Sequence, residues 1–173
     1  MISKEQFTDI YTQYVDKIYR FIFIKVNSPE VAQDLTSETF TKILEHFKRN
    51  SEGGSHVENP GAFLYGAARN VVYDYYRQKG KSHVLLSDEN SFILDKESPD
   101  HYRADYAVSK EDNSRQIRNA LSKMSDDYRE LLTLRYIEDM SAKEISEILK
   151  KPQGTIRVML HRGLKELREI LEA

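Results

Sequence analysis

A row of basic and polar side chains near the carboxyl end of the chain has the composition and spacing of a surface that binds duplex DNA. The row falls on one face of a helix predicted from Gln153 to about Leu171, and its members are Thr155, Arg157, Val158, His161, Arg162 and Lys165. Arginine can donate to guanine edges or to phosphates, and lysine mostly pairs with phosphates. Such a helix can lie in the major groove. The pattern predicts DNA reading, with an ordinary hairpin carrying a solvated basic face as the alternative.

A second group of residues, in the first half of the chain, combines tyrosine rings with cations. The group recurs along a helix predicted from Pro60 to Lys79, and it comprises Tyr65, Arg69, Tyr73 and Tyr76, flanked by Asn70 and Arg77. Aromatic rings stack on exposed bases while cations hold the phosphates. The pattern indicates a surface for single-stranded nucleic acid. The alternative is that the tyrosines are partly buried and the arginines are ordinary surface residues.

Residues for catalysis or metal binding are not grouped in this way. The chain has no cysteine, which excludes disulfides, zinc fingers and thiol chemistry. Paired carboxylates with a base at a recognisable spacing do not occur, and neither does a glycine-rich phosphate loop. His161 has no other histidine close to it in sequence, so a metal role is disfavoured. We therefore expect a protein that is not an enzyme and needs no cofactor.

The elements that position these two groups are all predicted to be helices. Apolar residues recur at three- and four-residue steps, and strand patterns are almost absent. Local signals mark several helix starts: Ser28 and Asn59 each precede a proline, and Ser141 with Glu144 forms a capping box. Lys151 and Pro152 separate the last two helices. We predict an all-α fold in which residues 141–171 form a helix-turn-helix, with Ile145, Ile148 and Leu149 packed against Ile156, Leu160 and Leu164.

Charges are sorted along the chain, although the formal net charge is only −2. Residues 60–82 carry four basic residues against one acid, and residues 150–168 carry six against one. The stretch between them, residues 84–114, carries eight acids against three basic residues and shows no sustained apolar period, which is typical of a linker. We predict two small domains, residues 1–82 and 109–173, joined by a flexible acidic linker, residues 83–108.

Hydropathy places the protein outside the membrane. The longest uncharged apolar run, Phe21 to Ile24, is far too short to cross a bilayer. The first residues lack the apolar stretch of a signal peptide. We therefore expect a soluble, cytoplasmic protein without membrane insertion.

Two further segments carry motifs that occur together in one known family. The segment Asp34–Phe40, followed by Val57–Asn70, looks like the second conserved region of sigma-70-type RNA polymerase sigma factors. Residues from Ala120 to Leu171, which include Leu131–Tyr136 and Gly154–Arg157, look like the fourth region. The short length, with only a linker between the two regions, resembles the extracytoplasmic-function (ECF) subfamily.

The resemblance implies that the protein binds core RNA polymerase and directs it to promoter DNA, while the polymerase performs all the bond chemistry. The implied polymerase-binding residues are Asp34, Leu35, Glu38 and Phe40. The implied residues for capturing and opening the minus-ten element are Arg69, Asn70, Tyr73 and Arg77, with the loop from Lys48 to Asn59. The last helix would read the minus-thirty-five element.

The resemblance also implies a partner that controls the protein. We expect no extension that folds over the two basic faces, and therefore control by expression level or by a separate anti-sigma factor. In the subfamily an anti-sigma factor commonly clamps between the two domains, and the predicted linker would allow that.

Other classes of protein fit the sequence less well. A helix-turn-helix regulator that works without polymerase would have a similar last helix, but it would not need the segments Asp34–Phe40 and Pro60–Arg77. Co-purification with core polymerase separates these two readings. A helical interaction protein, such as an anti-regulator, is disfavoured by the two basic faces.

Overall fold

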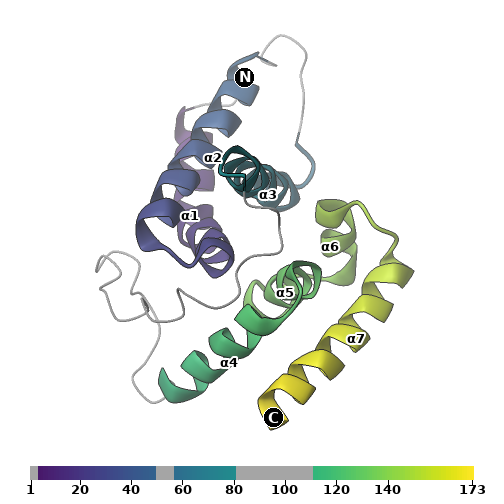
Figure 1. Cartoon of the computed structure of the whole chain (residues 1–173). Coiled ribbons are helices and arrows are strands. Elements are labelled where there is room, and N and C mark those ends of the chain that lie inside the picture. Colours follow the sequence, from purple (N-terminus) through teal and green to yellow (C-terminus); the bar gives the residue numbers. More distant parts are fainter. Residues whose placement is uncertain (1–3, 50–56, 81–110) are drawn as a thin grey trace. The chain divides into compact units, whose positions relative to one another are not determined.

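The computed structural model describes residues 4–49, 57–80 and 111–173, and every regular element in these ranges is helical. The predicted all-α fold is therefore confirmed. The chain divides into two compact units (Figure 1), with α1, α2 and α3 in the first and α4, α5 and α7 in the second. α6 is joined by short turns to the elements before and after it and is described with them. The predicted linker, residues 83–108, lies outside the described residues.

The first unit is a bundle of three helices that all contact one another: α1 (Lys4–Val26), α2 (Pro29–Arg49) and α3 (Pro60–Gln78). Two of its helix starts are fixed by the predicted side-chain caps. The Val31 amide donates to the Ser28 hydroxyl at 3.4 Å, and the Ala62 amide donates to the Asn59 side chain at 3.0 Å. These bonds satisfy amides that have no partner within the helix.

The core of the first unit is formed by apolar side chains from all three helices. Its fully buried members include Ile18, Phe21, Ile22, Ile43, Leu64, Tyr65, Val71 and Val72. Tyr65 has no exposed surface, and its ring meets the Phe21 ring edge-on with the centroids 5.3 Å apart. Tyr65 is therefore a core residue, although the sequence pattern predicts it to lie on the surface.

The second unit contains α4 (Glu111–Lys123), α5 (Asp126–Leu132) and α7 (Gln153–Glu172), and α6 (Ala142–Leu149) lies between α5 and α7 in the sequence. α4 and α5 both pack on α7. Leu121, Met124 and Leu132 form a buried cluster, against which Leu160 and Leu167 of α7 are packed.

A short π-helical segment, η3 (Thr133–Ile137), follows α5 directly and was not predicted. The Glu138 amide donates to the Thr133 carbonyl at 3.0 Å, a bond that spans five residues instead of four. The Arg135 guanidinium then donates to the Met140 carbonyl at 2.7 Å and holds the turn that follows. Such segments are rare and mostly comprise a single turn within or beside an α-helix, and the apolar periodicity of the sequence gives no signal for them.

The turn between α6 and α7 lies where it was predicted, but one residue of α7 packs differently from the prediction. Lys150 adopts a left-handed conformation with φ of 53°, and the Ser146 hydroxyl donates to the Lys151 carbonyl at 2.6 Å. Ile156 is fully buried, as predicted, but Leu164 is 41% exposed, so the prediction that Leu164 packs into this core is wrong.

The inward position on this part of α7 belongs to Gly163 instead. A Cβ atom at Gly163 would lie 3.3 Å from the Tyr128 ring and 3.6 Å from Leu132. The absence of a side chain therefore lets α7 approach α5 closely. Side chains of α5 occupy this part of the core, and Leu164 does not.

The cap of α6 gives a prediction about stability. The Ser141 hydroxyl accepts from the Glu144 amide at 3.2 Å, and the Glu144 carboxylate accepts from the Ser141 amide at 2.8 Å. The bond from the Ser141 backbone, followed by that from its hydroxyl, lowers the pKa of Glu144 below its usual value of 4.5. Ser141→Ala should cost about 0.5–2 kcal/mol of folding free energy at neutral pH. Hydrogen exchange of the α6 amides at graded urea concentrations measures the loss.

The pH dependence of this loss has a defined sign. A carboxylate whose folded pKa is lowered stabilises the fold above its unfolded pKa, and that stabilisation disappears as pH falls through the lowered folded value. Ser141→Ala keeps the backbone bond to Glu144 and removes the hydroxyl bond at 2.7 Å, so the part of the difference that depends on this hydroxyl bond should shrink in acid. Ser125→Ala is the matched control, because Ser125 precedes α5 without making a side-chain cap bond. Equal losses in both variants would contradict a special role for the Ser141 cap.

Candidate polymerase and DNA interfaces

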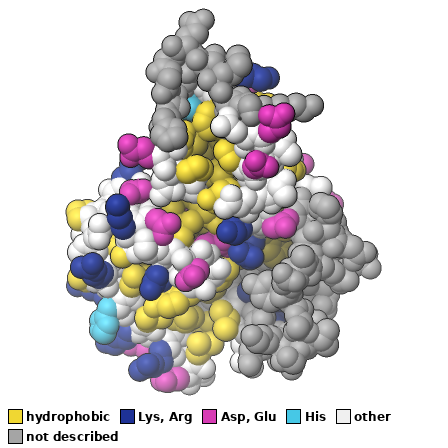
Figure 2. All heavy atoms as spheres, turned by 180° about the vertical axis from the view of Figure 1, so that it is seen from behind, with side chains coloured by type: hydrophobic (Ala, Val, Ile, Leu, Met, Phe, Trp, Pro, Cys, Tyr) yellow, Lys and Arg dark blue, Asp and Glu magenta, His cyan; other side chains and the backbone are white. Residues whose placement is uncertain are grey.

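The six predicted DNA-reading residues of α7 all lie on the exposed side of that helix. Thr155, Arg157, Val158, His161, Arg162 and Lys165 are exposed, whereas Ile156 and Gly163 face inward. α7 lies at the right of Figure 1, and Lys and Arg side chains gather on the corresponding left side of Figure 2, which shows the molecule from behind. Lys165 lies 3.9 Å from Glu169, and both side chains are well exposed, so the pair is weak. The helix thus presents a cationic surface of the predicted composition.

Only part of the predicted tyrosine row of α3 is exposed. Tyr73 is 52% exposed, and Asn70 is also exposed, but Tyr65 is buried in the core. Tyr76 is half-buried, and its hydroxyl donates to the Lys25 carbonyl at 2.8 Å, which ties α3 to the end of α1. The prediction that Tyr65 belongs to an exposed row is wrong.

The division follows from helix geometry. A step of four residues advances about 40° around a helix of 3.6 residues per turn. Tyr73 therefore lies about 80° from Tyr65, whereas Tyr76, eleven positions along, returns to within about 20° of it. The candidate surface on α3 consists of Asn70, Tyr73 and Arg77, with Arg69 half-buried at its margin.

Two of the four predicted polymerase-binding residues of α2 are exposed, and two are buried. Asp34 and Glu38 are exposed, but Leu35 and Phe40 are 6% and 4% exposed. The Phe40 ring contacts the Tyr11 ring edge-on, with the centroids 4.9 Å apart. Leu35 and Phe40 are core residues of this unit, and the docking role predicted for them stays a prediction. What the helix offers to a partner is the acid pair one turn apart.

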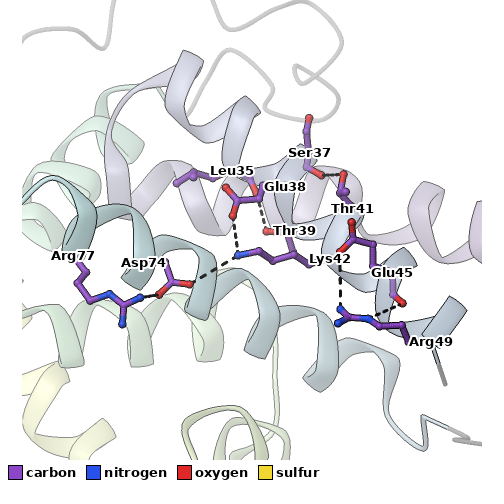
Figure 3. Close-up of polar contacts among 10 residues, drawn as sticks. All are labelled: Leu35, Ser37, Glu38, Thr39, Thr41, Lys42, Glu45, Arg49, Asp74 and Arg77. Atoms are coloured by element: carbon purple, nitrogen blue, oxygen red, sulfur yellow. Dashed lines mark hydrogen bonds and ion pairs between the residues drawn. The ribbon is translucent and has the colours of Figure 1, made fainter.

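A chain of four charges that the sequence analysis missed connects the surfaces of α2 and α3 (Figure 3). The Lys42 ammonium lies 2.8 Å from a Glu38 carboxylate oxygen and 3.9 Å from Asp74. On α3, the Arg77 guanidinium lies 3.1 Å from Asp74. The two pairs within a helix have the spacings of three and four residues that favour such contacts, which is a readable signal. The contact between helices, from Lys42 to Asp74, has no sequence signal.

An aromatic cluster joins the end of α2 to the start of α3 and was also missed. The His46 ring lies 4.9 Å from the Phe63 ring, and the Phe47 ring lies 6.0 Å from it. All three side chains are half-buried. The cluster fixes the two helix ends that flank the predicted minus-ten loop, of which residues 50–56 lie outside the described ones.

Neither a membrane-spanning helix nor a group of metal ligands occurs among the described residues. Within residues 4–49, 57–80 and 111–173, no helix is long and apolar enough to span a membrane. No three His, Cys, Asp or Glu side chains of these ranges lie close enough together to hold a metal ion.

A three-helix unit and a unit ending in a helix-turn-helix with a cationic outer face define a helical transcription protein. Residues 10–82 match the family description "Sigma-70 region 2", and residues 114–167 match "Sigma-70, region 4". The chain is 30% identical over 165 residues to the ECF RNA polymerase sigma factor SigM of Bacillus subtilis (strain 168), covering 94% of this chain and 93% of SigM. The chain belongs to the ECF sigma factors of the sigma-70 family.

Two further comparisons agree with this assignment. The ECF RNA polymerase sigma factor BldN of Streptomyces coelicolor is 28% identical over 167 residues, which cover 96% of this chain and 61% of BldN. The sigma factor RpoE of Bartonella quintana, solved in complex with the anti-sigma factor NepR, has a TM-score of 0.70 at 20% identity, with 98% of each chain covered. That structure shows that the fold is shared.

Membership of the family confirms the function that the resemblance implied. The protein is an RNA polymerase sigma factor: it binds core polymerase and directs transcription initiation, and it is not an enzyme. The alternative of a regulator that works without polymerase is set aside, because the first unit matches the family as well as the second.

Proposed function

We propose that the two units divide the promoter between them, with residues 1–82 serving core polymerase and the minus-ten element and residues 109–173 serving the minus-thirty-five element. The exposed row on α7 is the observation that supports this division best. Six residues suited to DNA contact share one face of α7, while Ile156 and Gly163 hold its other face in the core. A helix fixed along one side presents its opposite side rigidly to a groove.

On α3, we assign contact with the separated minus-ten strand to the surface formed by Asn70, Tyr73 and Arg77. Tyr73 offers an exposed ring for stacking, and Arg77, whose side chain is 70% exposed, offers a cation for a phosphate. Arg69 and Tyr76 border this surface and support it from half-buried positions. The assignment keeps five of the six residues predicted from sequence and removes Tyr65.

On α2, we assign contact with core polymerase to Asp34 and Glu38. Both carboxylates are exposed, and they lie one turn apart on the same face. Leu35 and Phe40 hold that face in place from the core. A basic surface on the polymerase would complement such a pair.

The assignment of α7 is tested by Arg157→Ala. If Arg157 reads a base edge, the variant should lose roughly 1–3 kcal/mol of binding to the preferred promoter and discriminate less against other sequences. If it contacts phosphate only, binding to all sequences should weaken alike, and the salt slope should fall by about one. Fluorescence anisotropy on promoter and random duplexes at several salt concentrations separates the two.

The control for this test is Arg118→Ala, which removes the same charge from an exposed position on α4. Arg118→Ala should leave promoter binding close to wild type. An effect of Arg157→Ala no larger than that of Arg118→Ala would remove α7 from the DNA interface.

We further propose that the protein acts in the cytoplasm, where core polymerase is, and that an anti-sigma factor holds it inactive. The structurally similar RpoE is bound to an anti-sigma factor, which supports such a partner here. Affinity purification of the tagged chain from its host, under conditions that keep it silent, should recover a stoichiometric protein other than polymerase subunits. Recovery of polymerase alone would favour control by expression level.

A further inference from the structure

Asp74 lies in an unexpected place for a carboxylate. It follows Tyr73 and precedes Arg77 by three positions, so it borders the surface of α3 that we assign to the DNA strand. A negative charge there repels phosphate and weakens DNA binding, so its presence at this position suggests another role. In the structure the Asp74 carboxylate faces two cations, Arg77 at 3.1 Å and Lys42 at 3.9 Å (Figure 3).

Lys42 is shared unequally between two acids. Its ammonium lies 2.8 Å from Glu38 and 3.9 Å from Asp74, so Glu38 is its closer partner. While Glu38 holds Lys42, the closest cation to Asp74 is Arg77. If a cation from outside engaged Glu38, Lys42 would be released toward Asp74 and would compete with Arg77 for that carboxylate.

We propose that Asp74 is a positioning residue that restrains Arg77 in the free protein, and that Lys42 relays the occupation of Glu38 to it. Docking of α2 on polymerase would then free Arg77 for the DNA strand. This inference rests on the proposed function of the α2 and α3 surfaces.

The size of the effect is limited by exposure. The side chains of Asp74 and Arg77 are 36% and 70% exposed, and solvent screens such pairs. An exposed pair is worth about 0.2–1 kcal/mol, which converts to a change of about one and a half to fivefold in affinity. Asp74→Asn should therefore tighten binding of the full chain to mixed-sequence single-stranded DNA by that factor, measured by fluorescence anisotropy.

A double-mutant cycle with Arg77→Gln separates restraint from simple repulsion. If Asp74 acts by holding Arg77, the gain from Asp74→Asn should vanish in the Arg77→Gln background. A gain of the same size in both backgrounds would show plain charge repulsion and overturn the restraint. Asp74→Glu, which keeps the charge, should stay near wild type. If Arg77→Gln alone leaves binding unchanged, the proposed DNA contact of α3 fails, which is a different outcome.

The relay through Lys42 has its own matched control. Glu38→Gln should raise affinity only when Asp74 is present, whereas Glu45→Gln removes the same charge from the Glu45–Arg49 pair of α2, outside the chain of four. In the assembled holoenzyme, where docking already occupies Glu38, the gain from Asp74→Asn should shrink. Equal effects of Glu38→Gln and Glu45→Gln, or an undiminished gain from Asp74→Asn in the holoenzyme, would overturn the relay.

Discussion

Tyr65→Ala is expected to destabilise the first helical unit by about 3–5 kcal/mol, the usual loss when a large buried ring is deleted. Tyr65 has no exposed surface, and its ring packs edge-on against Phe21 in the centre of the three-helix bundle. Tyr73→Ala, two helical turns away on the same helix, should change stability by no more than about 0.5 kcal/mol, because that ring is 52% exposed. Urea unfolding followed by circular dichroism measures both changes.

Although Tyr73→Ala should leave stability nearly unchanged, it should impair transcription. Tyr73→Ala should remain folded and yet initiate poorly on duplex promoters, since a lost base stack costs on the order of 1–3 kcal/mol. On templates already mismatched at the start region the defect should be smaller. An equal defect on both templates would mean that Tyr73 serves docking or folding and not strand separation.

Arg129 gives the second large expected effect. Its side chain is buried, and its guanidinium donates to the carbonyls of Leu121 at 2.9 Å, Met124 at 3.0 Å and Ser122 at 3.2 Å. These carbonyls lie at the carboxyl end of α4, where few backbone amides remain and a positive charge is favourable. The Leu121 carbonyl also accepts from the Met124 amide at 3.2 Å. Arg129→Met should therefore cost about 3–4 kcal/mol, near the upper end for single substitutions.

Two controls define the cause of this loss. Arg129→Lys keeps the charge but not the planar donor array, so it should recover only part of the stability. Arg118→Met removes an exposed arginine from α4 itself and should cost little. Because α4 packs on α7, the Arg129→Met variant should also lose duplex binding. A loss in Arg129→Met as small as in Arg118→Met would contradict the role of Arg129 as a helix cap.

Helix starts were predictable from the sequence because they depend on residues three positions apart. Ser28, Asn59 and Ser141 each make the side-chain bond that their spacing predicts. The exposed row on α7 was equally readable, since a regular helix with Ile156 buried turns Arg157 and His161 outward. At these positions the interactions within one helix are enough to predict what the structure shows.

The burial of some residues was not predictable from the sequence, because it depends on contacts between helices. Leu35 and Phe40 belong to the same short motif as Asp34, but a single step along a helix rotates a side chain by about 100°, and both side chains are buried. The spacing of four residues from Tyr65 to Arg69 and from Arg69 to Tyr73 is regular, but two such steps advance about 80° around the helix, so Tyr65 and Tyr73 lie on different faces. The cap made by Arg129 joins α5 to α4, and no periodicity within either helix reveals it.

Run-off transcription with purified core polymerase on a promoter library tests the central claim most directly. We expect transcripts from a subset of promoters that share a minus-thirty-five and a minus-ten element, only when both core polymerase and this protein are present. The variant with Asp34→Lys and Glu38→Lys should stay folded and lose these transcripts, together with its competition against another sigma factor. Unchanged polymerase output on addition of the protein, while the protein alone binds specific duplexes, would contradict the account and favour a regulator independent of polymerase.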